Sequence, residues 1–151
     1  TKGLARPTVI LAKYTVAAIS MTVSFWVSFA GAYGYTYYLW TDAALPHIVS
    51  AAFFMWMMGF LYLSILILGC VLFKQTFTSI LFTGGIVALL SILSMVKPLS
   101  AFNPVVLTSQ NIDLISGEIS VTEFIIPLII SVFLSIVFLA AAIKAFNKKQ
   151  L

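Results

Sequence analysis

The sequence has 151 residues, of which 62% are hydrophobic and only 8% are charged, and its formal net charge is +4. A soluble domain carries about 25% charged residues, so this chain lacks the surface that a soluble fold requires. The basic residues form no patch interleaved with polar side chains, so the positive charge does not indicate a nucleic-acid partner. The length fits one transmembrane domain, residues 1–151, built from a few helices in contact with membrane lipid.

The chain opens with a short basic segment that leads into an uncharged stretch from Tyr14 to Thr41. At about 1.5 Å per helical residue, some twenty residues cross the roughly 30 Å hydrocarbon core, so this stretch predicts the first transmembrane helix. Small side chains recur along it at steps of three or four: Ser20, Ser24, Ser28 and Gly31. Such a stripe favours helix packing, or a face turned toward a dimer partner or a transport pathway.

Three further apolar runs predict the remaining crossings: Ala43 to Phe73, Gln75 to Val96 and Phe124 to Ile143. Pro46 moves the expected start of the second helix to about His47. The short connection at 73–76 predicts that the second and third helices are antiparallel neighbours. Helices are required because backbone groups in lipid must be paired within their own segment, and no strand-like alternation is present. The predicted fold class is all-α, an integral membrane bundle of four transmembrane helices.

A longer segment, residues 97–123, connects the third and fourth runs. Its middle, from Val105 to Ile115, has apolar residues at roughly helical spacing. This pattern predicts a short interfacial or re-entrant helix, which Gly117 ends as a C-terminal breaker.

The charged residues favour one orientation in the membrane. If the N-terminus is cytoplasmic, the only basic residue on the outer side is Lys97, which lies there with all the acidic residues. The positive-inside rule therefore predicts that both termini are cytoplasmic. The basic residues on the inner side are Lys2, Arg6, Lys13, Lys74, Lys144, Lys148 and Lys149.

The chain offers few groups for chemistry. Cys70 and His47 are the only residues of their kinds, so they cannot form an iron–sulfur cluster, a bis-histidine haem or a closed zinc site. Cys70 lies within an apolar run, where we expect a small buried side chain. No charge is placed at mid-membrane depth, and no Walker motif or catalytic set is present. We expect no catalytic residue, metal ligand or cofactor-binding residue in this chain.

Three segments, in order, resemble parts of one transporter family. They are the opening Lys2-Gly3-Leu4-Ala5-Arg6 with Lys13 further on, the outer Asn103-Pro104 followed by Leu114-Ile115-Ser116-Gly117, and the ending Ala145-Phe146-Asn147-Lys148-Lys149-Gln150-Leu151. They resemble permeases of the ABC-2 type of ATP-binding cassette transporters: the cytoplasmic stretch before the third helix, the segment between the fifth and sixth helices, and the basic tail. Gln150 stands where that family often has an acidic residue, and its first two helices are missing here.

The resemblance implies that the chain is the C-terminal four helices of a six-helix permease domain. In that family two permease subunits pair to form the substrate pathway and bind two cytosolic ATPase subunits, which bind ATP and Mg and carry out the hydrolysis. The expected location is the plasma membrane of a bacterium, with a multi-pass topology. The resemblance also implies that Lys2, Gly3, Leu4, Ala5 and Arg6 lie close to the ATPase, where their basic character suits an acidic groove.

Two other functions stay open on the sequence alone. One is a non-transporting four-helix membrane subunit that scaffolds or regulates a larger complex, and the other is the substrate-capturing membrane component of a vitamin importer. The chain begins with Thr1, and we expect it to be part of a longer protein. Two more spanning segments upstream would favour the permease, whereas a start codon just before Thr1 would favour the scaffold.

Overall fold

The computed structural model describes residues 6–39, 47–73, 75–96 and 101–148. Within these ranges every regular element is helical, and four helices are long and apolar enough to cross a membrane. The prediction of an all-α chain with four such helices is therefore confirmed. They are α1 (Arg6–Leu39), α2 (Ile48–Leu72), α3 (Thr76–Ser94) and α7 (Ile125–Lys148).

The first and last of these helices are longer than the apolar runs that predicted them. α1 begins at Arg6 rather than Tyr14, and α7 continues to Lys148 rather than ending at Ile143. Lysine and arginine are good helix formers whose long stems lie along apolar surface, so a lysine ends an apolar run without ending a helix. The 34 residues of α1 extend about 51 Å, well beyond the thickness of a hydrocarbon core.

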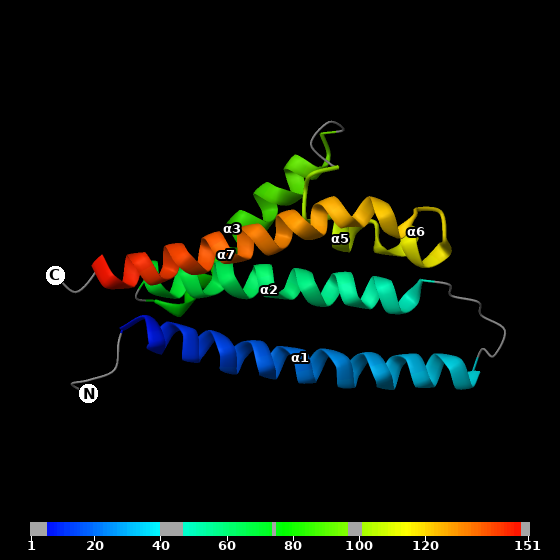
Figure 1. The fold of residues 1–151 in the computed structure, drawn as a ribbon, viewed down its shortest axis with the longest axis horizontal. Coiled ribbons are helices and arrows are strands. Elements are labelled where there is room, and N and C mark those ends of the chain that lie inside the picture. The colour runs from blue at the N-terminus through cyan, green and yellow to red at the C-terminus, as the bar shows by residue number, and fades with distance from the viewer. Residues whose placement is uncertain (1–5, 40–46, 74, 97–100, 149–151) are drawn as a thin grey trace.

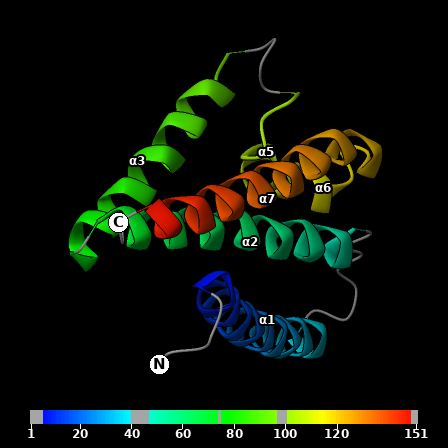
Figure 2. The same ribbon diagram turned by 60° about the vertical axis from the view of Figure 1, so that its left-hand side comes forward.

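α2 lies at the centre of the bundle and contacts α1, α3 and α7 (Figures 1 and 2). α1 begins and α7 ends at the same end of the bundle, which is also where α2 is followed by α3 (Figure 1). We call this the basic end, because Lys13, Lys144 and Lys148 belong to it. The opposite end, which we call the far end, holds the acidic residues Asp113, Glu118 and Glu123.

This separation of charge between the two ends is what the predicted orientation requires. The assignment of the basic end to the cytoplasm stays a prediction. Lys97 and Asp42, which the prediction placed on the outer side, lie outside the described residues.

The core of the bundle is the contact between α2 and α7, which run parallel. Phe54 stacks on Phe124 with ring centroids 5.1 Å apart, and further along both helices Ser131 Oγ donates to Met58 Sδ at 4.0 Å. The buried face of α7 is made of small or compact side chains, which let the two backbones approach closely. The buried residues on this face are Pro127, Ser131, Ser135 and Ala142. The buried row on α2 includes Ala51, Phe54, Met58, Leu61 and Ile65.

The connection between α2 and α3 is tight, as its short length predicts. A Cβ atom added to Gly69 of α2 would lie 3.1 Å from the backbone oxygen of Ser79 and 3.2 Å from the Phe82 ring on α3. The Phe73 and Phe82 rings also meet, with centroids 5.5 Å apart. The prediction that these helices are antiparallel neighbours is confirmed.

The segment before α7 forms two short helices rather than one. They are α5 (Val106–Ser109) and α6 (Asn111–Ser116), separated at Gln110, and a 3-10 turn, η1 (Val121–Phe124), leads into α7. Gly117 ends α6 in the left-handed conformation, with φ of 82°, and the Glu118 amide bonds the Asp113 carbonyl at 2.9 Å, so Gly117 acts as the predicted breaker. Buried Leu107 and Leu114 place this pair in the same core as α2. Its depth in a membrane stays a prediction.

Candidate functional site

α1 is joined to the rest of the bundle by a narrow line of contacts. Trp56 Nε1 on α2 donates to Thr22 Oγ1 at 3.1 Å, and Ser64 Oγ on α2 is hydrogen-bonded to the Tyr14 hydroxyl at 3.4 Å. Between these bonds, the side chain of Met21 reaches Gly59, where an added Cβ atom would lie 2.8 Å from its sulfur. At each of these points one bulky side chain, Trp56, Tyr14 or Met21, meets a small residue, and openings lie beside the contact.

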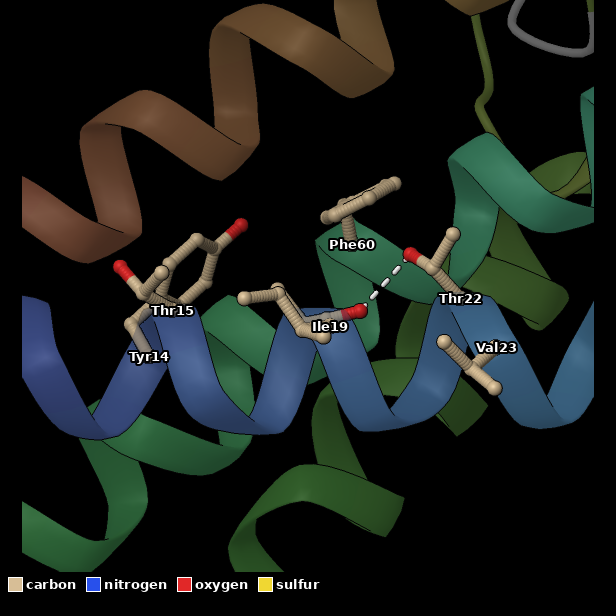
Figure 3. Close-up of a pocket in the computed structure, with 7 residues that line it drawn as sticks. Tyr14, Thr15, Ile19, Thr22, Val23 and Phe60 are labelled. Atoms are coloured by element: carbon tan, nitrogen blue, oxygen red, sulfur yellow. Dashed lines mark hydrogen bonds between the residues drawn. The ribbon is translucent and has the colours of Figure 1, made fainter.

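One opening, of about 390 Å³, lies between the first half of α1 and Phe60 of α2 (Figure 3). Its walls are apolar apart from three hydroxyl groups, those of Tyr14, Thr15 and Thr22. Both threonine hydroxyls donate to their own helix: Thr15 to the Leu11 carbonyl at 2.8 Å and Thr22 to the Ala18 carbonyl at 2.7 Å. The opening therefore favours an apolar group over a strongly polar one.

A second opening, of about 420 Å³, continues the same gap toward the far end. Its α1 wall is largely aromatic, with Phe25, Phe29 and Tyr33, and its opposite wall comes from α2 and α6. Ser28 of α1 and Asn111 of α6 supply polar groups there. We call the two openings together the α1–α2 groove.

The predicted small-residue stripe lies beside this groove rather than in it. Ser20, Ser24, Ser28 and Gly31 are all exposed, and no heavy atom lies within 4 Å of where a Cβ atom on Gly31 would sit. Only Ser28 lines an opening. The corresponding pair on α7, Ser131 and Ser135, is buried, so a small stripe mediates packing there, while the α1 stripe stays a prediction of a contact beyond this chain.

Asn103 and Pro104 are buried and join α5 to α3. Asn103 Nδ2 donates to the Leu90 carbonyl at 2.6 Å, while its Oδ1 accepts the Val105 amide at 3.0 Å. The Pro104 carbonyl accepts the Leu107 amide at 3.0 Å, which starts the first turn of α5. The predicted outer motif is thus a structural clamp, in the part of the chain before α5.

Asn111 is a second clamp, which the sequence reasoning missed. Its Nδ2 group donates to the Ala51 carbonyl of α2 and to the Leu107 carbonyl of α5, both at 3.0 Å, and its side chain is buried. Asn111 follows Thr108, Ser109 and Gln110, so the sequence does not distinguish it from an exposed polar run, although once buried its amide has to be hydrogen-bonded.

The predicted ATPase-coupling residues Lys2, Gly3, Leu4 and Ala5 lie outside the described residues, as does the side chain of Arg6, whose backbone begins α1. Cys70 is exposed, so the expectation of a buried cysteine was wrong. It lines an opening between the end of α2 and the start of α1, where few side chains cover it.

The described residues do not assemble a metal centre. Among them, no group of three histidine, cysteine, aspartate or glutamate side chains lies close enough to hold a metal ion. Every buried side-chain nitrogen or oxygen in these ranges has a hydrogen-bond partner. The lining of the α1–α2 groove is mostly apolar, so it favours contact with apolar groups. No family profile, characterised protein or solved structure matches the chain.

Proposed function

We propose that this chain is the transmembrane permease part of an ABC-2 type exporter, in which two permease subunits form the substrate pathway and cytosolic ATPase subunits supply the energy. The observation that carries the proposal is that the segment between α3 and α7 is folded into short helices that pack on the bundle. The outer residues that resemble the family, Asn103 with Pro104 and the 114–117 segment, all belong to the buried α5–α6 pair and its ends. A segment held by Asn103 before α5 and by Asn111 at the start of α6 fits a functional part of the permease better than a loose connection.

The placement of α1 supports the same proposal. Its small-residue face is free for a second permease subunit or for the substrate pathway, since small residues permit close helix contacts. Its opposite side borders the apolar α1–α2 groove, which suits an amphipathic or lipid-like cargo. The basic segment before α1, whose residues lie outside the described ranges, suits an acidic partner by its charge.

A non-transporting scaffold subunit is the second candidate. The observation that favours it is the dense α2–α7 core, in which the buried polar groups of the described residues are all internally satisfied. A scaffold would use the free face of α1 to hold a helix of another subunit.

Co-purification separates the two candidates. The full-length protein, expressed with ABC ATPase subunits, is isolated in detergent, returned to lipid and assayed for ATP hydrolysis. The permease proposal predicts a stable complex that contains two copies of this chain and two ATPase subunits. A chain that is stable alone and binds no ATPase subunit would favour the scaffold.

A further inference from the structure

A third opening, of about 670 Å³, lies on the other side of the α1–α2 contact from the groove, at the basic end. We call it the basic-end crevice. Its walls come from the start of α1 and the last turns of α2, with Phe146 of α7 at its edge. It reaches along α2 from Phe73 to Leu63, which is about 15 Å at about 1.5 Å per helical residue. Its volume lies within the roughly 300–1,000 Å³ range of small-molecule sites.

Among the described residues, Lys13 is the only charged one that lines the crevice. It is exposed, and the rest of the lining is apolar apart from Cys70. No carboxylate is available nearby within the described residues, because Asp113, Glu118 and Glu123 all belong to the far end. A cation above an apolar crevice, with no acidic partner at its end of the bundle, complements a ligand that combines an anionic head with an apolar tail.

The position of Lys13 along the bundle specifies where that ligand comes from. The crevice contains Cys70 from the last turn of α2 and Phe146 from the last turn of α7, so its mouth lies where the helices end. In a bilayer this is the headgroup level, to which a lysine near a helix end extends its ammonium group. Because Tyr14 is hydrogen-bonded to Ser64, Lys13 lies about two turns inside this mouth, and its long stem lets the ammonium group extend back toward the headgroups. Leu63 lies deeper, at acyl-chain level.

We propose that the basic-end crevice binds one anionic phospholipid of the surrounding leaflet, with its phosphate at Lys13 Nζ and one acyl chain along Leu66 toward Leu63. This site is independent of the proposed transport function, because the lipid is a resident of the crevice and not the cargo. Its acyl chain fills the space between α1 and α2, and so the lipid reinforces the narrow contact between these helices at the basic end.

Lipid binding to purified protein tests the headgroup contact. The full-length protein in detergent is titrated with phosphatidylglycerol or with phosphatidylcholine of the same acyl chains, and bound lipid is counted by native mass spectrometry. Lys13→Gln should weaken phosphatidylglycerol binding about fivefold, the value expected for one basic residue near a charged lipid surface, and leave phosphatidylcholine unchanged. Lys13→Arg should retain binding. Lys144→Gln is the matched control, because Lys144 is an exposed cation of the same end that does not line the crevice.

Cys70 locates the bound lipid, because it is the only cysteine of the sequence and it lines the crevice. Phosphatidylglycerol should slow alkylation of Cys70 by N-ethylmaleimide in the wild type and in Lys144→Gln, and should not slow it in Lys13→Gln. Equal binding by Lys13→Gln and Lys144→Gln would overturn the headgroup assignment. Binding without protection of Cys70 would place the lipid elsewhere, and protection of Cys70 without any lipid would mean that another protein segment fills the crevice; either result overturns the proposal.

Discussion

α7 and α1 both lie against α2 and both are strongly apolar, yet they pack against it in different ways. α7 presents compact side chains, Pro127 and Ser131 among them, and buries them against α2. α1 presents Met21 and Trp26 to α2, and its serines are exposed, with Ser28 alone among the predicted stripe lining an opening. Because lipid is as apolar as the helices, close packing depends on shape and on polar contacts rather than on apolar character. Apolar composition therefore identifies a membrane helix but does not predict how closely that helix packs against its neighbours.

The difference divides the described chain into two parts. α2, α5, α6 and α7, with one side of α3 packed against them, form a unit whose core is closed, whereas in α1 Ile10 is the only buried side chain among residues 8–39. In the proposed permease, the closed unit is the fixed part and α1 is the part that meets partners. Substitutions in the two parts should differ in their effect on stability, and each experiment below tests that difference.

The largest loss of stability is expected at the centre of the closed unit. Phe124→Ala removes the ring that stacks on Phe54 and leaves a cavity, so it should lower the free energy of unfolding by about 3–5 kcal/mol. Unfolding by SDS titration in mixed micelles measures the change. Phe77→Ala is the matched control, because the Phe77 ring is 71% exposed, and it should cost little. Equal effects of the two substitutions would contradict the closed core.

The α2–α3 junction should not accept a methyl group. In Gly69→Ala the new Cβ meets the fixed backbone oxygen of Ser79, so overpacking should destabilise the protein by about 1–3 kcal/mol. Gly84→Ala adds the same methyl group to α3, where nothing lies within 4 Å, and should be neutral or slightly stabilising. The two variants are compared in the same SDS titration. A neutral Gly69→Ala would show that α2 and α3 are not held together at this point.

Loss of the Asn111 side chain on α6 should lower the free energy of unfolding by less than loss of the Phe124 ring does. Asn111→Ala removes two hydrogen bonds, to the Ala51 and Leu107 carbonyls, and should destabilise the protein by about 1–2 kcal/mol. The matched control is Asn147→Ala, which changes an exposed asparagine near the end of α7. If the clamp holds α6 on α2, proteolysis between α6 and α7 should also become faster in Asn111→Ala only. Identical proteolysis of the two variants would refute the clamp.

The smallest effect is expected between α1 and α2. A double-mutant cycle with Thr22→Val and Trp56→Phe isolates their hydrogen bond, and the coupling should be about 0.6 kcal/mol, the average for polar contacts between membrane helices. A coupling energy as large as the loss of stability in Phe124→Ala would mean that α1 belongs to the closed unit. A coupling of zero would place the two side chains apart.

The sequence predicts the position of the helices well and their orientation about their own axes poorly. The start near His47 and the end at Gly117 follow from local rules, because a proline is tolerated at the beginning of a helix and not in its interior, and a left-handed glycine ends a helix. The inward face of α1 does not follow from a local rule. Its serine stripe has the pattern of a packing face, yet the contacts of Met21 and Thr22 place a neighbouring face of the helix against α2. That choice depends on which surfaces the rest of the protein and its partners offer.

The candidate site was partly predictable in the same sense. The Asn103–Pro104 motif was recognised, but its clamp on the Leu90 carbonyl depends on a fold that brings α3 beside α5. The openings beside α1 arise from the bulk of residues such as Met21 at the contact. The spacing of residues along one helix does not predict the distance between two packed helices.

The proposal that α1 connects a cytosolic ATPase to the closed unit is tested most directly by ATP hydrolysis of the full-length complex in lipid. Arg6→Glu reverses a charge where α1 begins, and Lys148→Glu makes the same reversal where α7 ends, on the same end of the bundle. The account predicts that Arg6→Glu lowers hydrolysis to the rate of the isolated ATPase subunits, while Lys148→Glu leaves it close to the wild-type rate. Equal rates for Arg6→Glu and the wild type would contradict it.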